Sequence, residues 1–116
     1  MIYLATPYSD ADPAVMQFRF ESVTAAAAEL MSRGQHVFSP ITHSHPIAQV
    51  GHLPVEWDYW EAYDKRLLAI CDQLYVLTLD GWQESVGVAA EMKLARNMGK
   101  PIRYYDPERV INPKGA

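Results

Sequence analysis

The sequence predicts an α/β protein: a small, doubly wound parallel sheet of four to five strands with helices on both faces, as in flavodoxin-like and Rossmann-like folds. Two observations predict it. Short strand-like runs alternate with helical segments along the 116 residues, and no repeat, linker or low-complexity stretch divides the chain. We therefore expect a single domain over 1–116, with an irregular tail from about residue 107.

The first half of the chain alternates strand, helix and strand. Its predicted elements are a strand at 2–5, a helix at 15–31 that ends at Gly34, a strand at 36–39 and a long loop at 40–54. Asp12 before Pro13 indicates the helix start, because a carboxylate caps the first turn and proline suits the first helical position. The strand at 36–39 stops at Pro40, and the loop after it carries three histidines and two more prolines.

The second half repeats the alternation. Its predicted elements are a helix at 57–71, a strand at 73–79, a turn containing Gly81, a helix from about 85 to 98 and a strand at 102–105. Gly99-Lys100-Pro101 ends the last helix. In the irregular tail, 110–111 could pair as a short edge element.

Composition excludes several classes of function. Fourteen acidic residues against ten basic ones give a net charge of −4, which disfavours binding to nucleic acid or to an anionic membrane. The single Cys71 excludes an internal disulfide and a thiol cluster for zinc. No secretory signal or membrane-spanning run is evident, so we expect a cytoplasmic protein that acts on a small molecule or on another protein.

The predicted topology locates the site. In open parallel sheets, ligands bind outside the carboxyl ends of the strands, near the point where the strand order reverses. Three segments follow strands here: 6–9, 40–52 and 80–85. We expect them to border a common pocket.

Two carboxylates fall on the apolar faces of predicted helices. On a helical wheel, Asp64 lies in a stripe with Trp57, Trp60, Leu67, Leu68 and Cys71, and Glu91 lies at the centre of the face formed by Val88, Leu94, Ala95 and Met98. A buried carboxylate costs several kcal/mol or becomes protonated. The acids either pair with tyrosine, arginine or histidine in a structural role, or form a catalytic pair of the kind used in glycosidic chemistry.

Ser85 marks the start of the second of these helices. A helix N-terminus exposes free N–H groups and suits a phosphate or carboxylate, although an ordinary serine cap is the commoner use of this position.

These residues also carry a family resemblance. The segments are Tyr3-Leu4-Ala5-Thr6-Pro7, the helix around Asp64 that ends at Cys71-Asp72, and Ser85-Val86-Gly87-Val88-Ala89-Ala90-Glu91 followed by Ala95 and Gly99-Lys100-Pro101. With them the chain resembles the nucleoside 2-deoxyribosyltransferase superfamily over roughly 1–105, and within it a small group of uncharacterised bacterial proteins. Its opening loop departs from the pattern, since relatives have a glycine after the first strand.

The resemblance implies roles for individual residues. It makes Glu91 the nucleophile that attacks C1′ of the sugar, Asp64 an acid that assists the departing base, and Tyr3 an aromatic hydroxyl near the nucleophile. The transferases tend to carry aspartate at the position of Ser85. The related deoxynucleoside 5′-monophosphate N-glycosidases carry a serine there that contacts the phosphate, so Ser85 favours a nucleotide substrate.

The chemistry so implied is coherent. Glu91 would form a covalent glycosyl ester, and Asp64, with its pKa raised by the tryptophans around it, would donate a proton to the leaving base. Water or a second base would complete the reaction with net retention at C1′.

Further residues are expected to bind the substrate: Ser85, Gly87, Thr6, Tyr8, Ser9, Arg19, His43 and His45. Arg19 is a candidate phosphate partner, with a solvated helix arginine as the alternative. His43 and His45 share a side if their loop is extended, and pocket lining is favoured over metal binding because no further ligand spacing supports a metal. Trp57 and Trp60 are expected in the core or a subunit interface.

Three hypotheses follow. The first is an N-glycosidase acting on a nucleoside 5′-monophosphate through Glu91, Asp64 and Tyr3. The second is a deoxyribosyltransferase that exchanges bases, and the third is a nucleotide-binding module without turnover. No metal or other cofactor is expected, the ligand is a nucleotide or nucleoside, and the protein is expected to form a homodimer or a larger homo-oligomer.

Overall fold

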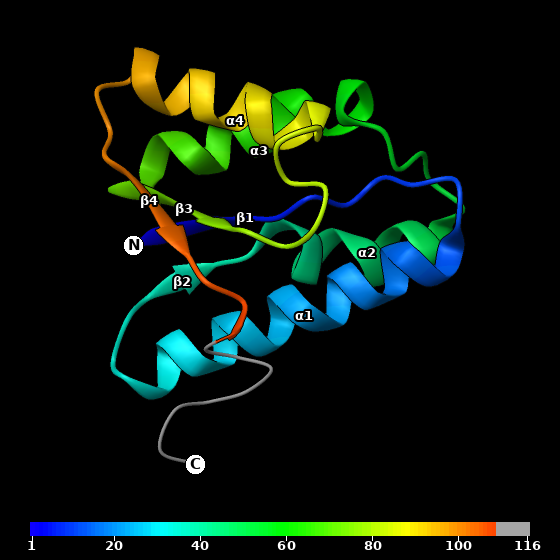
Figure 1. The fold of residues 1–116 in the computed structure, drawn as a ribbon. Coiled ribbons are helices and arrows are strands. Elements are labelled where there is room, and N and C mark those ends of the chain that lie inside the picture. Colours follow the sequence, from blue (N-terminus) through cyan, green and yellow to red (C-terminus); the bar gives the residue numbers. More distant parts are fainter. Residues whose placement is uncertain (109–116) are drawn as a thin grey trace.

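The computed structural model describes residues 1–108, and over that range it contains four helices and one four-stranded parallel sheet (Figure 1). The elements in chain order are β1 (Ile2–Ala5), α1 (Pro13–Ser32), β2 (Val37–Phe38), α2 (Pro40–Gly51), α3 (Trp57–Ile70), β3 (Gln73–Leu77), α4 (Val86–Asn97) and β4 (Ile102–Tyr105). The predicted doubly wound α/β class is confirmed, with four strands. Within the described range, no helix combines the length and apolarity needed to cross a bilayer.

The point at which the strand order reverses lies at the centre of the sheet, between β1 and β3. The strands lie in the order β2-β1-β3-β4, and every pair is parallel. The chain therefore moves outward from β1 first to one side and then to the other. The carboxyl ends of β1 and β3 flank this switch point, where open α/β sheets bind their ligands.

Side-chain alternation along β1 divides the core into two halves. Ile2 and Leu4 pack into the cluster on the α1 side, whereas Tyr3 and Ala5 pack into the cluster on the side of α3 and α4. Helices α1 and α2 cover one face of the sheet, and α3 and α4 cover the other (Figure 1). This alternation matters for the site, because it directs the Tyr3 side chain toward α4.

Helix α2 contradicts the long loop predicted for 40–54. Ser39 caps it by accepting a hydrogen bond from the backbone N–H of Thr42, and Pro40 occupies the first turn. Pro46 lies inside the helix, where it removes one backbone donor. The helix packs against α1 and β1. The loop prediction is wrong because proline and histidine content favours a loop only where no helix start precedes it, and Ser39-Pro40 is such a start.

The observed strand ends differ slightly from the prediction. β2 has only two residues, because its pairing with β1 is confined to Ile2 with Val37 and Tyr3 with Phe38. β3 ends at Leu77 instead of residue 79, because its partner β4 ends opposite it at Tyr105. The edge element predicted at 110–111 lies outside the described residues.

Lys100 connects the end of α3 to the start of β4. Its ammonium group donates to the carbonyls of Leu68 at 2.8 Å, Ala69 at 2.6 Å and Cys71 at 2.5 Å. The C-terminal turn of a helix leaves its carbonyls without partners and carries a partial negative charge, so a cation is favourable there. This contact gives Lys100 a structural role.

We predict that Lys100→Met lowers the free energy of unfolding by about 1–3 kcal/mol, because three carbonyls lose a charged donor. Urea denaturation measures the change. Lys93→Met, on the exposed side of α4, is the control and should change stability by less than about 0.5 kcal/mol. Equal effects of the two substitutions would contradict this role of Lys100.

Candidate active site

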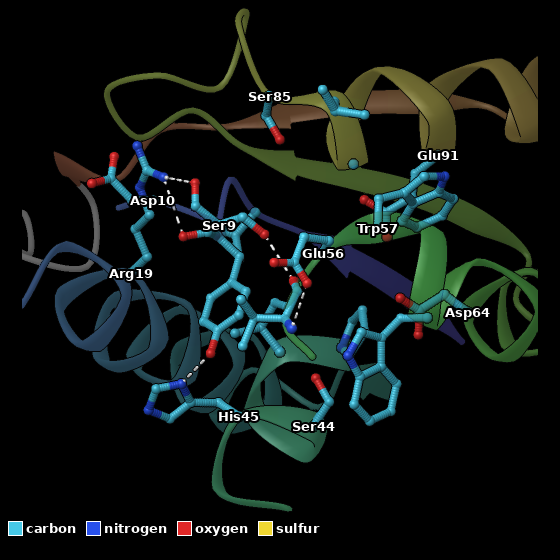
Figure 2. Close-up of a pocket in the computed structure, with 18 of the residues that line it drawn as sticks. Ser9, Asp10, Arg19, Ser44, His45, Glu56, Trp57, Asp64, Ser85 and Glu91 are labelled. Carbon is cyan, nitrogen blue, oxygen red and sulfur yellow. Dashed lines mark hydrogen bonds between the residues drawn. The ribbon is translucent and has the colours of Figure 1, made fainter. Parts of the chain in front are cut away.

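A cavity of about 470 Å³ opens at the switch point of the sheet (Figure 2). All three segments predicted to border the site contribute to it. Helix α3 and the loop that precedes it complete the wall. The sequence-predicted residues that line it are Thr6, Tyr8, Ser9, Arg19, His45, Asp64, Ser85, Gly87 and Glu91. Tyr3 joins them through its contact with Glu91, and His43 does not line the cavity.

Glu91 projects from α4 into the base of the cavity and is 5% exposed. The Tyr3 hydroxyl donates a hydrogen bond to Glu91 Oε2 at 2.5 Å. The pKa of Glu91 is raised to about 8, chiefly because the carboxyl group is buried; the hydrogen bond from Tyr3 lowers it and the nearby Asp64 raises it. The pKa of Tyr3 lies well above its ordinary value, chiefly because of burial, so Tyr3 stays a proton donor.

Asp64 reaches the same cavity from α3 and is 6% exposed. Burial raises its pKa to about 7. Its Oδ1 atom is buried and has no hydrogen-bond partner among the described residues. A buried carboxylate oxygen without a donor disfavours the ionised form, so Asp64 keeps its proton to a higher pH than an ordinary aspartate.

Trp57 and Trp60 line the cavity beside these acids, whereas the sequence predicted them in the core or an interface. Trp57 lies against the start of α4, where a side chain at Gly87 would meet its ring at 3.7 Å. The Trp60 ring is held by a 2.8 Å hydrogen bond from its Nε1 to the Pro54 carbonyl. The helical wheel identified the stripe but could not show that part of it faces a cavity.

The charges around the cavity are unbalanced. Among residues 1–108, the carboxyl groups that line it belong to Asp10, Glu56, Asp58, Asp64, Glu84 and Glu91, and one guanidinium, that of Arg19, lines it. This excess of acid would stabilise positive charge that develops on a bound molecule.

Arg19 lines the cavity and forms hydrogen bonds with the loops that follow β1 and β3. Its Nη1 donates to the carbonyls of Tyr8 and Ser9, each at 3.2 Å, and its Nη2 donates to the Asp80 carbonyl at 3.3 Å. Gly81 fits beside it at φ +90°, where a Cβ would lie 2.7 Å from Nη2. Because no carboxylate within 1–108 forms an ion pair with Arg19, its charge remains available to an anion.

Ser85 occupies the N-cap of α4, as predicted, and accepts a hydrogen bond from the backbone N–H of Val88 at 3.2 Å. Its hydroxyl points toward the cavity in Figure 2. The cap leaves the hydroxyl hydrogen free to donate, so Ser85 can be both a cap and an anion contact.

His43 and His45 do not share a side, although they would do so in the extended loop that the sequence predicted. In helix α2, residues two apart point in nearly opposite directions. His45 is buried and faces the cavity, whereas His43 is exposed and forms a 2.7 Å hydrogen bond with Tyr63. Within 1–108, no three His, Cys, Asp or Glu side chains are grouped closely enough to hold a metal ion.

Sequence reasoning missed several lining residues, including Ser44, Ala48 and Glu56. Ser44, His45 and Ala48 have the spacing of one helical face, which follows the Ser39-Pro40 helix start. This helix start is the sequence signal that predicts Ser44 and Ala48 on the same face as His45.

A family model described as "Domain of unknown function (DUF1937)" matches residues 1–107. The chain belongs to this DUF1937 family. The match covers every strand and helix given above. No curated protein matches the chain at a significant level.

The buried acid predicts a pH dependence of stability. The pKa of Glu91 is about 8 in the folded protein against an ordinary value of 4.5, so between these values the folded protein binds a proton that the unfolded chain releases. The free energy of unfolding therefore falls as pH rises through this interval. Glu91→Gln keeps an acceptor for Tyr3 and should raise the free energy of unfolding on the order of 2–4 kcal/mol at pH 8 and by little at pH 4.5.

Urea denaturation between pH 4.5 and 8.5 measures this difference. Glu61→Gln, on the exposed surface of α3, is the matched control and should keep the pH slope of the wild type. A Glu91→Gln variant whose slope equals that of the wild type would contradict the assignment.

Proposed function

We propose that this DUF1937 protein is an N-glycosidase that hydrolyses the bond between base and sugar in a nucleoside 5′-monophosphate. The observation that carries the proposal is the buried Tyr3–Glu91 hydrogen bond at the base of a cavity that also contains the protonatable Asp64. The resemblance of these segments to the nucleoside 2-deoxyribosyltransferase superfamily supports it.

Glu91 is the proposed nucleophile. The Tyr3 hydroxyl occupies Oε2, which leaves Oε1 as the atom that attacks C1′. Attack by the ionised carboxylate forms a glycosyl ester while the bond from C1′ to the base nitrogen breaks. The acidic lining supports this step, because the sugar becomes positively charged in the transition state.

Asp64 is the proposed acid. Its proton passes to the departing base, and the resulting carboxylate then accepts a proton from the water that attacks the ester carbon at C1′. The products are the free base and the sugar phosphate, and Glu91 returns to its carboxylate form with the configuration at C1′ retained.

The opposite end of the cavity supplies the proposed phosphate contacts. Arg19 has no carboxylate partner within 1–108, and Ser85 and Gly87 stand at the start of α4, where backbone N–H groups favour an anion. Thr6 and Ser9 line the same cavity, but their hydroxyls donate to the Pro7 and Val55 carbonyls, so we do not include them among the phosphate contacts. The placement of the proposed phosphate contacts fits a substrate that extends from Glu91 toward the loop after β3.

The first test is release of free base from ribo- and deoxyribonucleoside 5′-monophosphates and from the matching nucleosides. We expect release by the wild type from the monophosphates, and a loss of about 10³-fold or more in Glu91→Gln, with Glu61→Gln as the control. Product that appears only when an acceptor base is added would establish a transferase. No turnover with or without an acceptor would refute both enzyme hypotheses for these substrates. The hypothesis of a nucleotide-binding module would then remain.

The second prediction concerns the pH dependence of kcat/KM. The active form has Glu91 ionised and Asp64 protonated, which is the minor arrangement of the one proton that the pair holds between pH 7 and 8, because the pKa of Glu91 is the higher; the profile should still be bell-shaped, with limbs near pH 7 and 8. Asp64→Asn removes the proton donor, so the rate should fall by about 10²–10⁴ and the alkaline limb should disappear. Persistence of that limb in Asp64→Asn would contradict the role of Asp64.

A further inference from the structure

A chain of four side chains connects the cavity to the outer surface of α1, and the proposed reaction does not use it. The Tyr8 hydroxyl is 2.6 Å from His45 Nδ1, and His45 Nε2 is 3.0 Å from Gln17 Oε1. Gln17 Nε2 in turn donates to Glu21 Oε2 at 3.0 Å. Tyr8 and His45 line the cavity, whereas Glu21 is exposed to solvent.

These contacts fix the direction of every hydrogen bond in the chain. Because the Glu21 carboxylate only accepts, the amide nitrogen of Gln17 must face it, and the amide oxygen of Gln17 must face His45. His45 Nε2 therefore carries the hydrogen. In a neutral imidazole Nδ1 then has none, so the Tyr8 hydroxyl donates to it.

The imidazole is held firmly in this arrangement. His45 is 4% exposed and stacks on Phe20, with ring centroids 4.3 Å apart and an interplanar angle of 22°. Tyr8 meets the same imidazole edge-on, at 5.5 Å and 88°. Burial also lowers the pKa of His45, so the ring stays neutral at neutral pH.

With its hydrogen committed to His45, Tyr8 offers the cavity only the lone pairs of its oxygen. Neighbouring hydroxyls are committed in the same way, since Ser9 donates to the Val55 carbonyl at 2.8 Å and Thr6 donates to the Pro7 carbonyl at 3.3 Å. Together with the carboxyl groups described above, this part of the wall accepts hydrogen bonds. Its complement is a ligand group that donates.

We propose that Tyr8 selects the substrate by accepting a hydrogen bond from one of its donor groups, and that His45, Gln17 and Glu21 are positioning residues that hold Tyr8 in this accepting state. The proposal rests on the proposed function for the identity of the substrate as a nucleotide. Two kinds of nucleotide group can supply the donor, an amino group of the base or a hydroxyl of the sugar. A base carbonyl at the same place would face the Tyr8 lone pairs and be rejected.

Paired ligands test the proposal and identify the donor. Dissociation constants are measured by calorimetry in the Glu91→Gln background, which prevents turnover, with and without Tyr8→Phe. The pairs are adenosine and inosine 5′-monophosphate, the ribo- and 2′-deoxyribonucleotides, and the 3′-hydroxyl and 3′-deoxy nucleotides. In one pair, Tyr8→Phe should weaken the donor-bearing ligand about 3- to 10-fold and leave its partner within about twofold.

Gln17→Met tests the positioning chain from a distance, because Gln17 does not line the cavity. It frees His45 to carry its hydrogen on Nδ1, so the preference for the donor-bearing ligand of that pair should decrease. Gln49→Met, an exposed glutamine on α2, is the matched control and should leave the preference unchanged. Tyr59→Phe, outside the cavity, is the control for Tyr8→Phe.

The ¹⁵N chemical shifts of the His45 imidazole in the free protein test the proposal without a ligand, because they report which ring nitrogen is protonated. We expect His45 to be protonated at Nε2 and unprotonated at Nδ1, and to lose this bias in Gln17→Met. A proton on Nδ1 in the wild type would overturn this proposal alone, and so would equal losses for both members of every ligand pair. Failure of every nucleotide to bind would overturn the proposed function together with the substrate assigned to Tyr8.

Discussion

The hydrogen bond from the Tyr3 hydroxyl to Glu91 joins the centre of the sheet to helix α4 inside the protein. β1 is paired on both sides, so the Tyr3 backbone is fixed by its neighbours in the sheet. Glu91 approaches Tyr3 from helix α4, whose N-cap is Ser85, directly after the loop that follows β3. The contact therefore places one oxygen of an acid that lines the cavity against a rigid donor.

Two buried acids near each other are costly for the fold, and the structure limits the cost in two ways. Tyr3 donates to one of them, and burial keeps protons on both to higher pH than usual. The same features give the pair a proton to move near neutral pH. The destabilising element of the fold and the proposed chemical machinery are thus the same side chains.

The wall of the cavity is held by groups whose hydrogen bonds lie mostly within the protein. Arg19 ties the loop after β1 to the loop after β3. Tyr8 is tied to α2 through His45. These contacts come from residues far apart in sequence, so the cavity keeps its shape although loops and helix ends build much of it.

The sequence by itself determined the class of the fold and identified two buried acids that line the cavity. Alternating apolar runs and helical periodicity predicted the strands and three of the four described helices, and the topology located the three border segments. Periodicity also identified Asp64 and Glu91 as inward-facing acids, because a polar residue at the centre of an apolar stripe has no other direction to point.

Only the tertiary structure decided which side chains meet. α2 is a helix that packs against α1 and β1 despite Pro46, whereas local signals predicted a loop and paired His43 with His45 on one side. Whether a tryptophan fills a core or lines a cavity depends on what faces its helix, which Trp57 and Trp60 could not reveal from spacing. Which nitrogen of His45 carries the hydrogen depends on Gln17 and Glu21, which lie on another helix, because a tautomer is set by its partners in space.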